Sequence, residues 1–213
     1  MEKKLANKIY KVLDKMYPDA GTALIHANTM QLLVATILSA QCTDARVNIV
    51  TKDLFKKYRN VQDFARAKQS ILEKEIRSTG FYRNKAKNVI GSAKRILEHF
   101  GGKVPSEMED LISLPGVARK TANIVLFYSF GKNDGIAVDT HVKRLSARLG
   151  MTENMDPVKI ERDLMDLFEN EKWGKLSNLL IDHGRAVCNA RKPLCEKCRL
   201  KELCLFAKTC SEK

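Results

Sequence analysis

Apolar residues recur at helical spacing along most of the chain, and no segment alternates strictly between apolar and polar positions. Residues 84–100 place Val89, Ala93 and Ile96 on one face, and residues 29–39 are apolar nearly all round, which is typical of a central buried helix. The pattern predicts helices at residues 8–16, 29–39, 45–58, 61–67, 70–78, 84–100, 106–113, 118–130, 139–149, 157–168 and 176–187. We therefore expect an all-α fold.

The size and composition of the chain allow a packed core, in one large domain or two small ones. The chain has 213 residues, of which 44% are hydrophobic, and only 11 are Gly and 5 are Pro. These values exclude a disordered or collagen-like chain. A polar turn between Gly131 and Gly135 interrupts the helical pattern, and we interpret it as the boundary between two helical lobes.

The charge balance favours a polyanionic partner. Lysine and arginine number 38 against 25 aspartates and glutamates, which gives a net charge of +13 at pH 7. Nucleic acid is the usual partner of so basic a chain, although a solvated lysine-rich surface gives the same balance. The chain has no apolar run of about 18 residues and no secretory leader, so we expect a cytoplasmic protein (nuclear in a eukaryote) without a membrane partner.

Four of the six cysteines gather in one segment: Cys188, Cys195, Cys198 and Cys204. Two disulfides would account for them, but disulfides are rare inside cells. The Cys-x2-Cys pair is a common half-site for structural zinc, and four thiolates in loops also suit a 4Fe–4S cluster. The spacing alone does not choose between the two metals. Basic residues surround the segment, among them Arg191 and Lys192, and they are suited to contact phosphates or to offset cluster charge.

The sharpest chemical signal is the sequence Leu-Pro-Gly-Val-Ala-Arg-Lys-Thr-Ala at residues 114–122. Pro115 and Gly116 predict a tight turn between two helices, and the second helix begins with small residues. Backbone N–H groups at such a helix start are unpaired and can bind a phosphate without reading the base sequence. An ordinary corner between two helices is the simpler interpretation.

Lys120 is expected in the first turn of that second helix. Most lysines are surface charges. Here the positive end of the helix dipole and partial burial within an apolar segment would lower the pKa of Lys120 and make its amine nucleophilic. Such an amine can attack C1′ of a sugar and form a Schiff base.

Asp139 precedes a helix whose apolar stripe contains Val142, Leu145 and Leu149. An aspartate at this position usually serves as the N-cap of the helix. A catalytic role would also require an acidic residue, because a carboxylate can stabilise a developing oxocarbenium ion or deprotonate a nucleophile. The sequence alone does not bring Asp139 to Lys120.

Four features together resemble the endonuclease III branch of the helix–hairpin–helix DNA glycosylases. They are the segments LPGVARKTAN (residues 114–123), VDTHV (138–142) and LSAQCTD (38–44), together with the four-cysteine spacing. The resemblance implies two helical lobes, a six-helix bundle at residues 22–132 and a second lobe from residues 1–21 and 133–213. The spacing of residues 188–204 is similar to that of the family's 4Fe–4S loop, which favours the cluster over zinc.

The same resemblance implies a base excision repair enzyme that acts on double-stranded DNA with damaged bases or abasic sites. The damaged base would be flipped into a cleft between the lobes. Lys120 matches the Schiff-base lysine of the bifunctional glycosylase/AP lyases, which remove oxidised pyrimidines, and Asp139 matches the catalytic aspartate. Gln41 matches the residue that fills the gap left by the flipped nucleotide. The expected DNA-contacting residues are Gln41, Phe81, Gly116, Ala118, Arg119, Arg191 and Lys192, in a chain that acts as a monomer.

Two positions depart from the family pattern. Many members have glycine where this chain has Ala118. We expect a methyl group beside the phosphate-binding amides to lower the affinity for DNA, although alanine fits the start of a helix. Phe81 stands where a leucine wedge is common. An aromatic ring can still stack into the duplex, but the family's preference for the base opposite the lesion does not carry over to this chain.

Three other interpretations remain open on the sequence. A non-catalytic module could bind duplex DNA through the hairpin and the basic metal loop, and only Lys120 and Asp139 argue against it. A glycosylase without lyase activity would use Asp139 to activate water and Lys120 to contact a phosphate. A zinc-stabilised helical scaffold for protein partners is the third.

Overall fold

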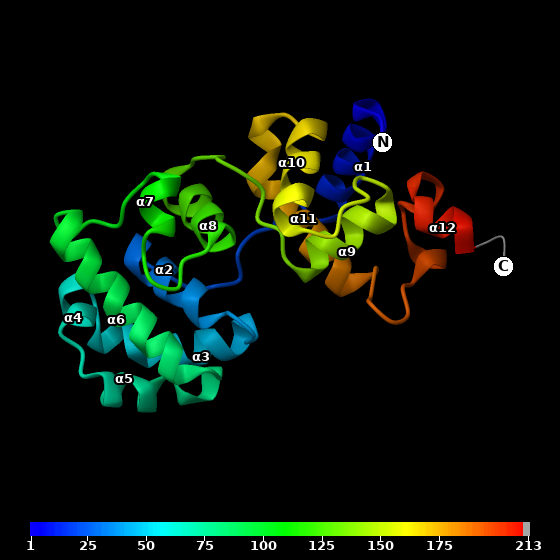
Figure 1. Ribbon diagram of the computed structural model, residues 1–213. Helices are drawn as coiled ribbons and strands as arrows, with labels where there is room; N and C mark the ends of the chain where they lie inside the picture. The colour runs from blue at the N-terminus through cyan, green and yellow to red at the C-terminus, as the bar shows by residue number, and fades with distance from the viewer. Residues whose placement is uncertain (211–213) are drawn as a thin grey trace. The chain divides into compact units, whose positions relative to one another are not determined.

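The computed structural model describes residues 1–210, in which it contains helices and no strand, so the all-α prediction is confirmed. The α-helices (Figure 1) are α1 (Lys3–Met16), α2 (Thr29–Leu38), α3 (Asp44–Lys57), α4 (Val61–Ala65), α5 (Gln69–Glu75), α6 (Tyr82–His99), α7 (Met108–Ile112), α8 (Arg119–Phe130), α9 (Thr140–Leu149), α10 (Pro157–Leu167), α11 (Trp173–Ala186) and α12 (Leu205–Cys210). Short 3₁₀ helices are η1 (Arg77–Thr79), η2 (Asn170–Lys172), η3 (Cys195–Lys197) and η4 (Lys201–Leu203). No helix in the described range is long and apolar enough to cross a membrane.

The chain divides into two compact units. The central unit is Ala23–Lys132, and the terminal unit combines Met1–Thr22 with the chain from Asn133 onward. Each unit has its own cluster of buried apolar residues.

Helix α2 forms the centre of the central unit. Every residue from Met30 to Leu38 is buried, as expected for a helix that is apolar nearly all round. The side chain of Asn28 caps the helix by accepting a hydrogen bond from the backbone N–H of Gln31 at 3.0 Å. Helices α3, α6 and α8 pack against α2, so the elements that carry the candidate DNA-contacting turns share one core.

Helix α6 is the long helix of the central unit (Figure 1). Its buried face contains the expected Val89, Ala93 and Ile96, but also the polar residues Lys85 and Ser92. The helix begins at residue 82 rather than 84, because residue 81 adopts a left-handed backbone conformation that starts the helix directly after a turn.

In the terminal unit, α1 packs against α11. Helix α1 buries Ala6, Ile9 and Leu13, and Lys175 of α11 pairs with Asp14 of α1 at 2.6 Å. The helix begins at residue 3 rather than 8, because the small side chain of Ala6 extends the apolar stripe by one turn toward the N-terminus.

Capping residues fix the helix ends that matter for the site. Gly131 and Gly150 end α8 and α9 in the left-handed conformation, as the sequence predicts. Asp156 caps α10 and accepts hydrogen bonds from the backbone N–H groups of Val158 and Lys159, both at 3.0 Å. Asp156 therefore has a capping role that needs no further function to explain it.

Candidate active site and cysteine centre

The predicted hairpin joins α7 to α8 and is supported from behind by α6. Gly116 has a φ of 77°, in the left-handed region that favours glycine. A Cβ atom on Gly116 would lie 2.5 Å from Nδ2 of Asn88. The hydroxyl of Ser92 donates a hydrogen bond to the carbonyl of Pro115 at 2.8 Å. The tight turn is thus confirmed, and side chains of α6 determine where it lies.

We expect Gly116→Ala to destabilise the chain and to weaken DNA binding. Left-handed backbone costs about 1–3 kcal/mol for a residue with a Cβ, and the clash with Asn88 adds a further ~1–3 kcal/mol. Gly101→Ala is the matched control, because Gly101 also has a positive φ (59°) but an added Cβ there meets no atom within 4 Å. Denaturant titration of both variants separates strain from clash. Equal losses of stability in the two variants would show that the contact with Asn88 is unimportant.

Ala118 is the N-cap of α8 and needs no glycine. Its φ of −92° and ψ of 168° are extended backbone, and it provides no side-chain hydrogen bond to the helix. The N–H groups of the first turn therefore depend on an acceptor from outside the helix, such as a phosphate oxygen. The departure from the family pattern at this position carries no backbone strain. Arg119, the first residue of the helix, is exposed.

Lys120 is the second residue of α8, as the sequence predicts, but its expected partial burial is wrong. The side chain is exposed. The core-facing side of α8 consists of Ala122, Asn123, Val125 and Leu126, and Lys120 does not fall on it.

Asp139 is the N-cap of α9. Its Oδ1 accepts a hydrogen bond from the backbone N–H of Val142 at 2.8 Å, so the capping interpretation is confirmed. Oδ2 takes no part in this bond and remains outside the cap. Lys120 belongs to the central unit and Asp139 to the terminal unit.

Gln41 and Phe81 occupy two turns of the central unit with the same unusual backbone. Their φ angles are 53° and 46°, and they are the two non-glycine residues with positive φ in the described chain. Gln41 is exposed, and 64% of the Phe81 surface is exposed. Each turn therefore holds its side chain away from the core in a conformation that costs free energy.

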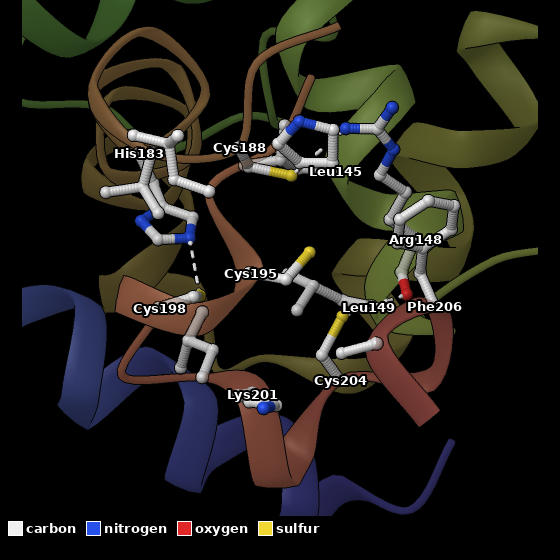
Figure 2. Close-up of a pocket in the computed structure, with 15 residues that line it drawn as sticks. Leu145, Arg148, Leu149, His183, Cys188, Cys195, Cys198, Lys201, Cys204 and Phe206 are labelled. Atoms are coloured by element: carbon white, nitrogen blue, oxygen red, sulfur yellow. Dashed lines mark hydrogen bonds between the residues drawn. The ribbon is translucent and has the colours of Figure 1, made fainter. Parts of the chain in front are cut away.

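The four clustered cysteines line a single pocket in the terminal unit. Figure 2 shows Cys188, Cys195, Cys198 and Cys204 placed around this space. All four are free thiols. No three metal-ligating side chains of the described residues converge on a single ion position. Four thiols around one pocket are a donor set that fits a group with several metal atoms and four thiolate ligands.

Nitrogen donors contact two of the cysteine sulfurs. Nη1 of Arg148 donates to Sγ of Cys188 at 3.3 Å, and Nε2 of His183 lies 3.5 Å from Sγ of Cys198 (Figure 2). The other ring nitrogen of His183 lies 3.0 Å from the hydroxyl of Tyr17. Burial lowers the pKa of His183 to about 4, so the ring is neutral near pH 7. With a thiolate at Cys198, Nε2 carries the proton and donates to sulfur, while Nδ1 accepts from Tyr17.

Burial also raises the pKa values of Cys198 and Cys204. A metal cation would offset this cost, because a coordinating thiol is deprotonated by the charge of the metal. Arg148 fixes the start of the cysteine loop by donating to the carbonyls of Asn189 and Ala190, each at 2.8 Å. The next two residues, Arg191 and Lys192, are exposed.

Several positioning residues have roles that the apolar pattern did not suggest. They are Lys85, Asn88 and Ser92 on α6, Arg148 on α9, His183 on α11, and Tyr17 after α1. For Lys85 and Ser92 the sequence does contain a signal. Both are polar residues at core-facing positions of an otherwise amphipathic helix, where a buried hydrogen-bond partner is required.

Comparison with known proteins identifies the family. The profile of the HhH-GPD superfamily base excision DNA repair proteins matches residues 34–170. Endonuclease III of Synechocystis sp. is 54% identical over 203 residues, 95% of this chain and 93% of that protein.

Two solved structures align with nearly the whole chain. A non-covalent endonuclease III–DNA complex matches with a TM-score of 0.94 and 41% identity, over 100% of both chains. A trapped covalent endonuclease III–DNA intermediate matches with a TM-score of 0.93 and 41% identity, over 99% of both chains. The chain therefore belongs to the HhH-GPD superfamily of base excision DNA repair proteins and, within it, to the endonuclease III family.

Proposed function

We propose that the chain is a bifunctional DNA glycosylase/AP lyase of base excision repair, which removes oxidised pyrimidines from double-stranded DNA with Lys120 as its nucleophile. The observation that carries this proposal is the place of Lys120. It is an exposed primary amine in the first turn of α8, four residues after the hairpin glycine Gly116. One similar structure is a trapped covalent endonuclease III–DNA intermediate, and a covalent intermediate requires a nucleophile on the protein.

The first half of the reaction removes the base. The amides at the start of α8 bind a backbone phosphate, and the flipped nucleotide presents C1′ to Lys120. Nζ of Lys120 attacks C1′ and the glycosidic bond breaks, so the base leaves with the bonding electron pair. The carboxylate of Asp139 stabilises the positive charge that develops on the sugar. Gln41 and Phe81 occupy the space that the flipped nucleotide leaves in the duplex.

The second half cuts the strand. After base loss, Nζ of Lys120 is bonded to C1′ of the closed sugar ring. The C1′–O4′ bond then breaks and O4′ takes a proton, which leaves Lys120 joined to C1′ as a Schiff base. Loss of a proton from C2′ then expels the 3′ phosphate, which nicks the DNA on the 3′ side of the lesion. Hydrolysis of the imine returns Lys120 to its free form.

The cysteine centre fits a 4Fe–4S cluster held by Cys188, Cys195, Cys198 and Cys204. When bound, the cluster supplies iron–thiolate bonds that close residues 188–204 into a rigid loop. Arg148 and His183 would donate hydrogen bonds to the ligand sulfurs, and Arg191 and Lys192 on the closed loop would contact DNA phosphates. These contacts support the cluster but not a role for it in bond breaking.

We expect Cys198→Ser to remove the cluster. The purified wild-type chain should be brown and contain about four iron and four sulfide per chain, and the variant should lose the visible absorption and most of the iron. It should also unfold at lower temperature, because the loop loses its crosslink. Cys42→Ser is the control, since Cys42 belongs to the central unit and should leave absorption and iron content unchanged. A colourless wild-type chain with one zinc atom would exclude the iron cluster.

The proposed activity is tested with a duplex that contains one oxidised thymine opposite adenine, and with the same duplex carrying one abasic site. We expect wild-type protein to release the oxidised base from the first duplex and to nick both duplexes only at the lesion. With borohydride present, it should form a covalent adduct with either duplex. Base release without nick or adduct would indicate a glycosylase that uses water. Tight binding without either product would indicate a non-catalytic module.

A further inference from the structure

The buried side chain of Lys85 connects two turns that are far apart in sequence. Lys85 lies on α6 and is 4% exposed. Its Nζ donates hydrogen bonds to the carbonyl of Leu38 at 2.8 Å and to the carbonyl of Thr79 at 2.7 Å. Leu38 is the last residue of α2, and Thr79 is the last residue of η1.

Both acceptors are carbonyls at a helix end, where no backbone donor of the same helix can reach them. A cation at a helix C-terminus is favourable because it meets the negative end of the peptide dipoles. Burial lowers the pKa of Lys85, which reflects the cost of removing its ammonium from water. The two short hydrogen bonds compensate for this cost. Lys85 is therefore held in place by its surroundings and is not a surface charge.

Each of these carbonyls lies just before one of the two strained turns. Gln41 comes three residues after Leu38, and Phe81 comes two residues after Thr79. Gln41 and Phe81 have φ angles of 53° and 46°, and such backbone conformations persist only where neighbouring structure imposes them. The N–H of Lys85 also donates to the carbonyl of Phe81 at 3.1 Å, so one residue contacts both turns.

We propose that Lys85 is a positioning residue that fixes the Gln41 turn and the Phe81 turn relative to each other, so that both side chains enter the vacated space in the duplex together. This inference rests on the proposed function, in which these two side chains fill that space. It predicts that the two turns act as one unit in recognising a gap, although Gln41 and Phe81 are 40 positions apart in the chain. Lys85 itself touches neither the substrate nor the reacting atoms.

The test compares Lys85→Met with wild type on two duplexes, one intact and one with a stable abasic-site analogue opposite 2-aminopurine. We expect the ratio of the variant's affinity for the abasic-analogue duplex to its affinity for the intact duplex to fall about tenfold, because misplaced turns no longer fit the gap. Its affinity for the intact duplex should stay within about twofold of wild type. The change in 2-aminopurine fluorescence that reports stacking in the gap should shrink in parallel. Lys94→Met is the matched control, since it removes the same charge from an exposed position of α6 and should keep the preference.

A double-variant cycle separates positioning from general destabilisation. In wild type, Phe81→Ala should reduce the preference for the abasic-analogue duplex over the intact duplex. In the Lys85→Met background, the same substitution should have little further effect. Additive losses, or an unchanged preference in Lys85→Met, would overturn the inference while the proposed function stands. If wild type itself shows no preference for the gap, the roles of Gln41 and Phe81 fail and the inference fails with them.

A shorter polar side chain guards against a folding defect. Lys85→Gln keeps an amide donor in the buried site and should retain more of the preference than Lys85→Met. Should Lys85→Met not yield folded protein, the same duplexes and the same cycle apply to Lys85→Gln. A Lys85→Gln chain with full preference and with additive losses would then overturn the inference.

Discussion

Lys120→Gln should abolish the covalent adduct that borohydride traps on abasic-site DNA. Glutamine cannot form a Schiff base, and removing the nucleophile of a covalent mechanism lowers the rate of base release and strand cleavage by about 1,000-fold or more. Because Lys120 is exposed, the substitution should leave folding unchanged. The measurement is the fraction of DNA that migrates as a protein adduct after reduction, at saturating protein.

Arg119→Gln is the matched control for Lys120→Gln. Arg119 is the preceding residue in the same first turn of α8, is also exposed, and carries the same charge. Both variants should lose a similar amount of DNA affinity, since each removes one positive charge near the backbone amides that are proposed to bind a phosphate. Only Lys120→Gln should lose the adduct. An adduct that persists in Lys120→Gln would assign the nucleophile to another amine.

Asp139→Asn should slow base release by roughly 100-fold or more, because the neutral amide no longer stabilises positive charge on the sugar. The cap of α9 should survive, since the asparagine side-chain oxygen can accept the hydrogen bond from Val142 that Oδ1 of Asp139 accepts now. Stability should therefore change by less than about 0.5 kcal/mol, and DNA affinity should stay close to wild type. Single-turnover base release, together with thermal unfolding, measures the two effects separately.

Asp156→Asn provides the comparison for Asp139→Asn. Asp156 caps α10 through the same kind of hydrogen bond and has no proposed catalytic role, so its amide variant should leave base release unchanged. Nicking of a preformed abasic site should suffer less in Asp139→Asn than base release does, because no glycosidic bond has to break. Equal falls in stability, DNA affinity and base release would leave Asp139 with its capping role alone.

Local chemistry explains why most of the helices could be predicted from the sequence. The apolar run that forms α2 admits no exposed face, and Gly131 and Gly150 end their helices where the left-handed conformation is required. Errors occurred where one small or strained residue decides a boundary. Ala6 lies on the buried stripe of α1, but alanine is too weakly hydrophobic for the sequence pattern to reveal this. The left-handed conformation of Phe81 is unexpected for an aromatic residue.

The candidate site was only partly accessible to the same reasoning. Lys120, Asp139 and the cysteines could be located because short motifs carry them. The residues that position the site could not, since Lys85 bonds to a carbonyl 47 residues away and Ser92 to one 23 residues away. Such contacts depend on how helices pack. The expected burial of Lys120 failed for the same reason, because an apolar segment does not tell which way each side chain of a helix points.

The packing of α1 against α11 has a consequence for synthesis on the ribosome. Helix α1 is made first, but its partner α11 follows roughly 160 residues later, which at about 5–20 residues per second is a delay of roughly 10–30 s. The central unit can complete its core within that interval, because its residues are contiguous. Ala6, Ile9 and Leu13 meanwhile lack the apolar partners that α11 supplies, so we expect this nascent segment to stay exposed to chaperones and proteases until α11 has been made.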